Sequence, residues 1–143
     1  MEQPKRLVSI LIPYLRIGNG FCVFLQKRSK DAKRLPDFFG FFGGGAKNGE
    51  GPEEALRREM SEEINFVPEG YIFFKMYEFS RNVKSIYYLE VDDGFEKQVE
   101  IKEGEYGKYF TEDEALNEPK LIEEDKIVLR DLFSKLREQA KVQ

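Results

Sequence analysis

Glutamates are crowded into one short segment of the chain, where their side chains could bind a metal ion. From Gly43 to Phe66 the sequence reads GGGAKNGEGPEEALRREMSEEINF, and Glu59, Glu62 and Glu63 lie together near its end. Like charges at i,i+4 spacing destabilise a helix by about 0.2–0.5 kcal/mol per pair. A cation shared between the carboxylates would compensate this repulsion.

The spacing of apolar residues predicts a helix over Pro52–Ile64 that positions these glutamates. Proline suits the first position of a helix, and the acidic residues that follow favour the positive end of the helix dipole. At about 100° per residue, the acidic side chains lie next to the apolar stripe of Leu56, Met60 and Ile64. Glu63 therefore lies at the edge of the buried face, where a carboxylate is costly unless it is protonated or joined by a cation.

The composition restricts the chemistry that the chain can perform. The sequence contains no histidine and a single cysteine, Cys22. Without histidine there is no Ser-His-Asp or Cys-His catalysis, so any general base must be Asp, Glu, Lys or Tyr. One cysteine allows neither an intramolecular disulfide nor a thiolate cluster for zinc. A metal site must be built from carboxylates and carbonyls, which favours magnesium, manganese or calcium.

Charge and hydrophobicity indicate the class of protein. The net charge of −4 argues against a broad basic surface, so we expect no extended nucleic acid partner. Hydrophobic residues make up 41% of the chain, and no apolar run approaches the roughly 20 residues of a membrane span. Glu2 and Pro4 precede the first short apolar run, which is not typical of a secretory signal. We expect a cytoplasmic protein with no membrane partner and a single domain over residues 1–143.

Apolar alternation and its flanking turn residues predict the strands and helices. The expected strands are Leu7–Pro13, Phe21–Arg28, Phe38–Phe42, Tyr71–Phe79, Lys84–Val91 and Tyr106–Phe110. A second long helix is expected over Glu123–Ala140, and a shorter one after Thr111, where Glu114 completes a capping-box pattern. The charged segment Phe95–Glu103 fits either a strand or a loop. Strands interleaved with long helices predict an α/β fold with a mixed sheet and helices packed against it.

The residues that precede the first helix are rich in glycine. The stretch GGGAKNGEG opens directly into the helix, so we expect a loop whose backbone could approach a ligand closely. It contains neither a dinucleotide-binding fingerprint nor a Walker A motif. Glycines also make ordinary turns, so this loop indicates a ligand only together with the glutamates that follow.

From Gly44 to Phe66 the chain resembles the Nudix box of the MutT-like Nudix hydrolases. The pattern is glycine, five residues, glutamate, seven residues, Arg-Glu, an aliphatic residue, any residue, Glu-Glu, any residue, glycine and an aliphatic residue. The matching residues are Gly44, Glu50, Arg58, Glu59, Met60, Glu62, Glu63 and Phe66. Asn65 stands where the family has glycine. The position just past a helix favours a left-handed backbone, which Asn tolerates next best, so we expect only a small cost in stability.

The resemblance implies the Nudix α/β/α sandwich and Mg²⁺-dependent cleavage of a nucleoside diphosphate linked to another group, with Mn²⁺ as an alternative ion. The implied metal ligands are Gly44, Glu59, Glu62 and Glu63. By the same resemblance, Arg58 orients a catalytic carboxylate in partnership with Glu50. The alternative for Arg58 is an ordinary helical ion pair with Glu54.

Weaker similarities extend on both sides of the box. The stretch RSKDAKRLPDFFGFFGGG is similar to the segment that leads into it, and EGEYGKYFTEDEAL is similar to a later segment that often supplies one more glutamate. Here that glutamate is Glu105, with Glu103 as the second choice. The general base is then either Glu62 or Glu105.

Other residues are candidates for binding a substrate. Arg28 and Arg34 could contact phosphates, and Phe39 could stack on a base. The predicted function is hydrolysis of a nucleoside triphosphate, or a related nucleoside diphosphate derivative, to a nucleoside monophosphate. Two alternatives stay open, namely a nucleotide-sensing or RNA-binding module without turnover and a hydrolase of nucleotide sugars. Because the family often forms dimers, a homodimer is a further expectation.

Overall fold

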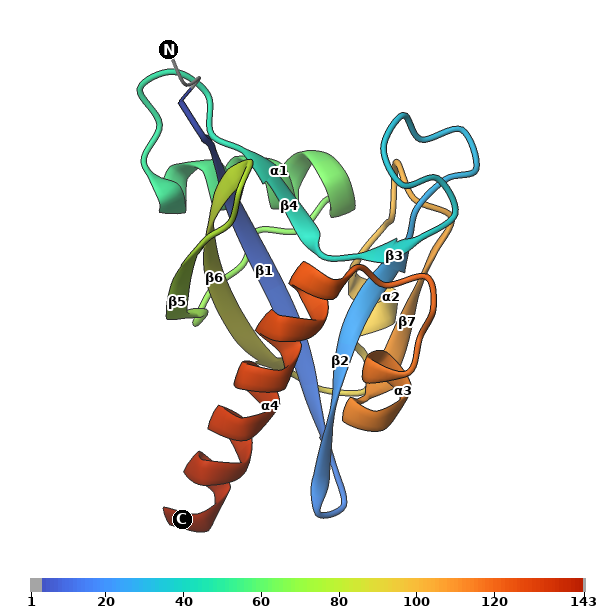
Figure 1. Ribbon diagram of the computed structural model, residues 1–143. Coiled ribbons are helices and arrows are strands. Elements are labelled where there is room, and N and C mark those ends of the chain that lie inside the picture. The colour runs from blue at the N-terminus through green and yellow to red at the C-terminus, as the bar shows by residue number, and fades with distance from the viewer. Residues whose placement is uncertain (1–3, 143) are drawn as a thin grey trace.

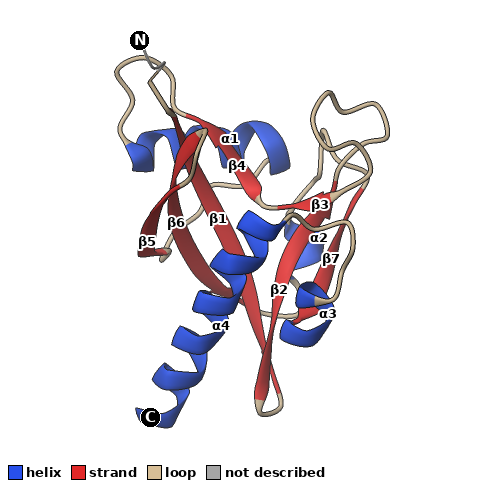
Figure 2. Ribbon diagram, viewed as in Figure 1, coloured by secondary structure: helices blue, strands red, loops and turns tan. Residues whose placement is uncertain are grey.

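The computed structural model describes residues 4–142, which form one mixed sheet with helices on both faces (Figures 1 and 2). The strands are β1 (Arg6–Ile17), β2 (Gly20–Lys27), β3 (Phe39–Gly40), β4 (Phe42–Gly45), β5 (Ile72–Glu78), β6 (Asn82–Val91) and β7 (Tyr106–Thr111). The helices are α1 (Pro52–Ile64), α2 (Phe95–Gln98), α3 (Glu112–Leu116) and α4 (Glu123–Val142). The predicted α/β class is confirmed.

Strand β1 is the centre of the sheet. On one edge it pairs in parallel with β6 from Arg6 to Leu15. On the other edge its first half pairs with β4 and its second half with β2, both antiparallel. Strand β2 pairs in turn with β3 and β7, and β6 with β5. Strand β1 changes its partner from β4 to β2 between Leu11 and Tyr14. Strand β4 therefore leads from the first half of β1 toward α1, whereas β2 leads from the second half of β1 toward the loop after Lys27.

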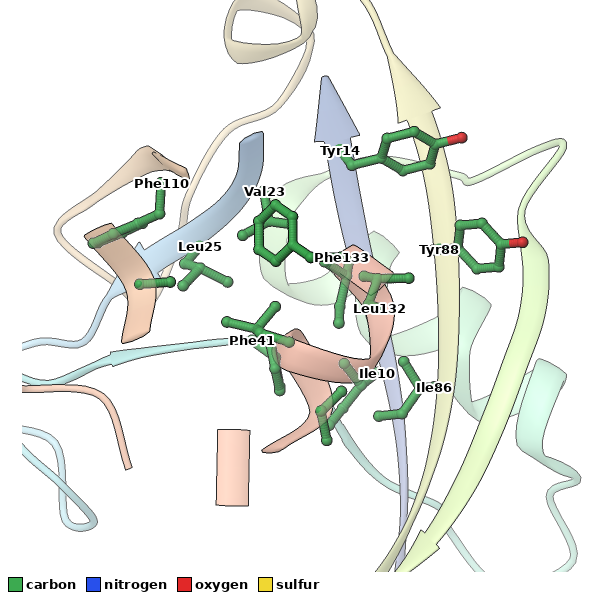
Figure 3. Close-up of a cluster of buried hydrophobic side chains, with 14 of the residues drawn as sticks. Ile10, Tyr14, Val23, Leu25, Phe41, Ile86, Tyr88, Phe110, Leu132 and Phe133 are labelled. Carbon is green, nitrogen blue, oxygen red and sulfur yellow. The ribbon is translucent and has the colours of Figure 1, made fainter. Parts of the chain in front are cut away.

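Side chains that alternate along β1 enter two separate cores. Ile10 packs in the core that contains Leu132 of α4, whereas Leu11 packs in the core that contains Leu56 and Met60 of α1. Figure 1 shows α4 in front of the sheet and α1 behind it. Figure 3 shows the first core, where Ile10 from the sheet lies close to Leu132. The helices therefore cover opposite faces, as an α/β/α sandwich requires.

Most of the predicted elements are confirmed. Helix α1 has the predicted bounds, and α4 begins at the predicted residue. Thr111 caps α3, because its Oγ1 accepts the Glu114 N–H at 3.2 Å while the Glu114 carboxylate accepts the Thr111 N–H at 2.8 Å. The undecided segment Phe95–Glu103 begins with the short helix α2 and continues without regular structure. No helix within residues 4–142 is both long enough and apolar enough to cross a membrane.

Besides shifts of one or two residues at other strand and helix ends, the structure differs from the prediction around β1, β3 and β4. Strand β1 continues past Pro13 to Ile17, because Pro13 lies where β1 changes partner and needs no hydrogen bond on that edge. The single strand expected over Phe38–Phe42 is two strands, β3 and β4. The first residues of the expected glycine loop belong to β4, and a Cβ at Gly43 would lie 2.1 Å from the Ser9 carbonyl oxygen. Only glycine, which here has φ +145, lets β4 approach β1 so closely.

The effect on stability of having asparagine at residue 65, where the family pattern has glycine, can be tested. Asn65 ends α1 in the left-handed conformation, with φ 51 and ψ 47, and its N–H donates to the Met60 carbonyl. Glycine adopts this conformation without the Cβ penalty, so we predict that Asn65→Gly raises the free energy of unfolding by up to about 1 kcal/mol. The control Asn65→Ala should lower it by a similar amount. Urea denaturation measures both, and identical midpoints for all three proteins would contradict the prediction.

Candidate active site

Helix α1 is held in one orientation by contacts at its start and along its buried face. The Ser9 hydroxyl of β1 donates to the Pro52 carbonyl at 2.7 Å, which ties the first turn to the centre of the sheet. Leu56, Met60 and Ile64 are fully buried, which sets the rotation of the helix about its axis. The glutamates at the edge of this buried face are thereby directed toward the end of β4.

Arg58 joins the segment after β4 to the helix. Its Nε and Nη2 donate to the two carboxylate oxygens of Glu50 at 2.7 and 2.9 Å, and Nη2 also donates to the Gly45 carbonyl at 3.0 Å. The Lys47 N–H donates to Glu50 at 2.7 Å. The Arg58 guanidinium, with help from this N–H, lowers the pKa of Glu50 to about 2. Glu50 is therefore an ionised anchor for the guanidinium, as a bidentate pair requires.

The same guanidinium holds two further glutamates. Its Nη1 donates to Glu59 and to Glu62, each at 3.1 Å. Glu54 instead accepts the Gly51 N–H at 3.4 Å, and no ion pair joins it to Arg58 among the described residues. The partnership of Arg58 with Glu50, rather than the helical pair with Glu54, is what the structure contains.

Glu63 extends toward β4 and away from Arg58. Its carboxylate accepts the Gly43 N–H at 3.0 Å. Burial raises the pKa of Glu63 to about 8; the charges of Glu59 and Glu103 contribute to this rise, while the Gly43 N–H and Arg28 oppose it. A cation beside Glu63 would restore the ionised form at neutral pH.

The residues around Gly44 fit a divalent ion. A Cβ at Gly44 would lie 2.5–2.7 Å from the Glu59 carboxylate atoms, so only glycine leaves room for that side chain. Two carboxylates beside a glycine backbone form an oxygen donor set, and Mg²⁺ needs few protein ligands because it keeps several waters. Within residues 4–142, no three acidic or cysteine side chains are already arranged so that they could hold a metal ion. Glu62 is 54% exposed and bound to Arg58, so the fit depends on Glu59 and Glu63.

These glutamates line a cleft that has two lobes. The inner lobe, of about 350 Å³, lies over the sheet near the start of α4, and its lining includes Phe39, Glu59 and Asp125. The outer lobe, of about 420 Å³, lies between residues 28–33 and residues 103–104. The residues that line both lobes are Arg28, Glu63 and Glu103. Those three side chains therefore form the boundary between the lobes.

The predicted substrate contacts come together in this cleft. Arg28 lines both lobes and Arg34 lines the inner one. Arg28 Nε donates to the Arg34 carbonyl at 2.9 Å, which braces the loop that carries both residues. Phe39 also lines the inner lobe, but it is only 6% exposed and packs edge-to-face on Phe110 at 4.9 Å between ring centroids. The core therefore limits how much of the Phe39 ring a ligand could contact.

The structure places Glu103, the second choice from the sequence, in the cleft in place of Glu105. Glu105 is exposed and lines neither lobe. Its N–H donates to the Lys27 carbonyl at 2.9 Å, where the chain begins to pair with β2. The chain turns at Gly104, where a Cβ would lie 2.7 Å from Gln26 Oε1, and of the two glutamates beside this turn only Glu103 lines the cleft.

Sequence reasoning missed a buried ion pair in the inner lobe. Lys84 Nζ donates to Asp125 Oδ1 at 3.2 Å and lies 3.3 Å from a Glu124 oxygen. Lys84 and Asp125 are 7% and 6% exposed. Burial raises the pKa of Asp125, which the Lys84 charge opposes. The one signal in the sequence was a lysine at the start of the expected strand Lys84–Val91, and its acidic partner lies in a different element.

Known proteins share the sequence family and the fold. The family model of the NUDIX domain matches residues 5–132. Among solved structures, a mutT/nudix family protein from Listeria innocua has a TM-score of 0.80 and 20% identity over 99% of this chain and 100% of that one. A C. elegans Ap4A hydrolase in a binary complex has a TM-score of 0.67 and 20% identity over 92% and 97% of the two chains.

A third similar structure contains a ligand. The NUDIX domain of Shewanella oneidensis NrtR, complexed with ADP ribose, has a TM-score of 0.66 and 17% identity over 98% of this chain and 88% of that one. No curated protein matches the sequence. At these identities the solved structures show a shared fold.

The raised pKa of Glu63 predicts how stability depends on pH when no divalent ion is bound. The carboxyl ionises at 4.5 in the unfolded chain and at about 8 in the folded protein. Between these values the folded state keeps a proton that the unfolded state has lost. The free energy of unfolding therefore falls as pH rises, by at most about 1.4 kcal/mol per pH unit for this one group.

Urea denaturation in EDTA at a series of pH values tests this prediction. Glu63→Gln should flatten the fall between about pH 5 and pH 8 relative to the unchanged protein. The background is small because the chain has no histidine to titrate in this range. Parallel pH profiles for the two proteins would show that Glu63 ionises normally.

Proposed function

The chain belongs to the Nudix hydrolase family, and from this premise we propose that it hydrolyses a phosphoanhydride bond of a nucleotide, using Mg²⁺ or, as an alternative, Mn²⁺. The proposed substrate is a nucleoside triphosphate or a related nucleoside diphosphate derivative, and the product is a nucleoside monophosphate. The observation that supports this most is the position of Glu59 and Glu63 in a cleft that Arg28 and Arg34 also line. The carboxylates suit a divalent ion, and the guanidinium groups suit phosphates.

Different residues of the cleft would bind the metal ion and the phosphate oxygens. Glu59 and Glu63, with the backbone at Gly44, would hold the ion. When bound, such an ion neutralises phosphate oxygens and makes a water molecule more acidic. Arg28 lies at the boundary of the two lobes, where its planar guanidinium would hold phosphate oxygens. Arg58 is a positioning residue, because its guanidinium keeps Glu59 in place and is itself held by Glu50.

Hydrolysis requires a group that accepts a proton from the attacking water. The water oxygen forms a bond to one phosphorus, and the bond from that phosphorus to the bridging oxygen breaks, so that the bridging oxygen leaves with the other phosphate. In a chain without histidine, a carboxylate is the natural acceptor. We assign this role to Glu103, which lines the cleft beside Glu63, in preference to Glu62 and Glu105.

Residues 1–143 would form a single domain whose substrate is a small nucleotide rather than extended nucleic acid. The proposed location is the cytoplasm, where such nucleotides are made and consumed. A homodimer stays a prediction.

A nucleotide panel tests the proposed activity. Nucleoside triphosphates, ADP-ribose and diadenosine tetraphosphate would be incubated with Mg²⁺, and nucleoside monophosphate release measured. We predict release from at least one of them, abolished by EDTA. Glu59→Gln and Glu63→Gln should each lower kcat/KM by about 100-fold, or about 2.7 kcal/mol, because metal-ion stabilisation of the transition state is worth several kcal/mol.

Glu69→Gln is the matched control, because Glu69 is exposed and lines neither lobe. Full activity in Glu59→Gln and Glu63→Gln would contradict the metal assignment. Tight binding of a nucleotide without release of any product would favour the alternative of a sensing module.

A second comparison tests the identity of the general base. Glu103→Gln should lower kcat by about 10²–10⁴-fold, the usual contribution of general base catalysis, and should remove the acidic limb of the pH–rate profile. Glu105→Gln should lose far less, because Glu105 lines neither lobe. A larger loss at Glu105 than at Glu103 would return the role to the residue that the sequence favoured.

A further inference from the structure

Strand β5 forms one edge of the sheet and has a free side. It pairs with β6, and within residues 4–142 no other strand pairs with it. Figure 1 shows β5 at the left edge of the sheet, on the far side of β1 from β2 and β7. The outer side of β5 therefore presents unpaired backbone N–H and C=O groups, which form a template for pairing with another strand.

Large apolar side chains are exposed along this edge. Ile72, Phe73 and Met76 are 53%, 51% and 56% exposed, and we call these three residues the edge patch. At the opposite edge of the sheet, β7 exposes a single large apolar side chain among the described residues, that of Tyr106. Apolar residues that are exposed singly need no explanation, whereas several along one strand edge indicate a surface that another chain covers.

Two residues of the edge patch lie on the face of the sheet that α1 covers. Phe73 lies opposite Tyr87 and Met76 lies opposite Ser85, two residues along β6. Tyr87 belongs to the core under α1, and Phe73 packs edge-to-face on its ring, with 5.4 Å between the ring centroids. The edge patch therefore continues this core outward to the edge of the sheet, where its side chains stay exposed.

The size of the edge patch can be compared with what an interface needs. About half of each of its three large side chains is exposed, which comes to roughly 300 Å² of apolar surface. A specific interface takes about 800 Å² from each partner and has an apolar centre with a polar rim. The edge patch is large enough to be that centre, with the strand backbone and the neighbouring polar side chains as the remainder.

The charges of β5 suit pairing with a second copy of the same strand. Lys75 and Glu78 carry opposite charges, and their side chains are 56% and 70% exposed even though Glu78 also pairs with Lys5 and Lys75 lies near Asp131. Two copies related by a two-fold axis present the same surface to each other, with their strands antiparallel. The basic end of each strand then approaches the acidic end of the other, which is favourable for both.

The regular part of the edge indicates where the two-fold axis passes. A bulge between Phe73 and Lys75 interrupts regular pairing, so the regular segment runs from Lys75 to Glu78, where β5 ends. In a symmetric antiparallel pair, one residue lies opposite its own copy. Repulsion between like charges disfavours Lys75 and Glu78 at this position, and the Tyr77 side chain is buried. Met76 is the exposed apolar residue that remains.

We propose that two copies of this chain associate through β5, antiparallel and about a two-fold axis at Met76. The two sheets then form one continuous sheet, in which each β5 has a strand on both sides. The Met76 side chains of the two copies contact each other, and Lys75 of each copy lies opposite Tyr77 of the other. The residues of the edge patch line neither lobe of the cleft, so the interface is separate from the proposed active site.

Sedimentation velocity over a range of micromolar concentrations tests this association. We expect the unchanged protein to pass from monomer to dimer as its concentration rises. Met76→Glu places two carboxylates against each other at the axis, so it should weaken the dimer by about 100-fold or more. Its melting temperature shows whether it folds. Ile17→Glu makes a similar change at an exposed apolar residue at the other end of β1, and should leave the dissociation constant unchanged.

A mixture of two charge variants tests the position of the axis. Met76→Glu and Met76→Lys should each be monomeric alone, because like charges then face each other. When mixed, they should form a dimer that contains one copy of each, because the two charges are now opposite. The same two substitutions at Ile17 should leave each protein as dimeric as the unchanged one. A general loss of stability would not be reversed by mixing, so this readout is specific to contact between the two copies of residue 76.

Three results would overturn the inference. They are an unchanged protein that stays monomeric at every concentration, a folded Met76→Glu that dimerises as strongly as the unchanged protein, and a mixture of the two charge variants that stays monomeric. If Met76→Glu proves unfolded, Met76→Thr provides the comparison, because it removes the apolar contact with a residue that suits a strand. That variant should weaken the dimer by a smaller factor, and an unchanged dissociation constant would equally contradict the interface.

Discussion

Carboxylates can share a small space only where each is compensated, and this requirement organises the site. The single guanidinium of Arg58 donates to Glu50, Glu59 and Glu62 and also to the Gly45 carbonyl, so one positive charge is shared among three carboxylates. Glu63 lies outside that network, and the Gly43 N–H does not offset its burial. No ion pair with a described side chain therefore balances the carboxylate of Glu63, and that of Glu59 is balanced only in part by Arg58. This excess of acidic groups is the electrostatic condition for binding a further cation.

The architecture of the sheet brings this carboxylate to a cleft. Because β1 exchanges β4 for β2, the glycine residues of β4 continue toward α1, whereas β2 leads to the loop that carries Arg28. Figure 1 shows the loop after β2 and the segment before β7 rising side by side at the end of the sheet where α1 lies. The proposed phosphate contacts, metal ligands and base thus come from segments far apart in the chain and meet at one edge of the sandwich.

The boundary between the lobes and the lobes themselves are built from different parts of the fold. Of the three boundary residues, Glu63 lies on α1, Arg28 follows β2 and Glu103 precedes β7. Both lobes are lined by charged and polar groups, but only the inner lobe also includes aromatic side chains and the buried pair of Lys84 and Asp125. Selectivity can therefore change with the loop residues while the reaction stays the same.

The sequence by itself determined the elements and groups whose signals are local. The apolar stripe and the proline predicted the bounds of α1, the pattern of Thr111 and Glu114 predicted a capped helix, and the spacing of the glutamates predicted a half-buried carboxylate at Glu63. Each of these depends on neighbours within a turn or two of helix, so periodicity and capping reveal it.

Only the tertiary structure decided which distant groups meet. It separated β3 from β4, placed Glu103 rather than Glu105 in the cleft, and joined Lys84 to Asp125 across two elements. These outcomes depend on strand partners and on close packing around particular glycines. Neither the periodicity of a segment nor the types of its residues contains that information, because the partner that decides the energy lies elsewhere in the chain.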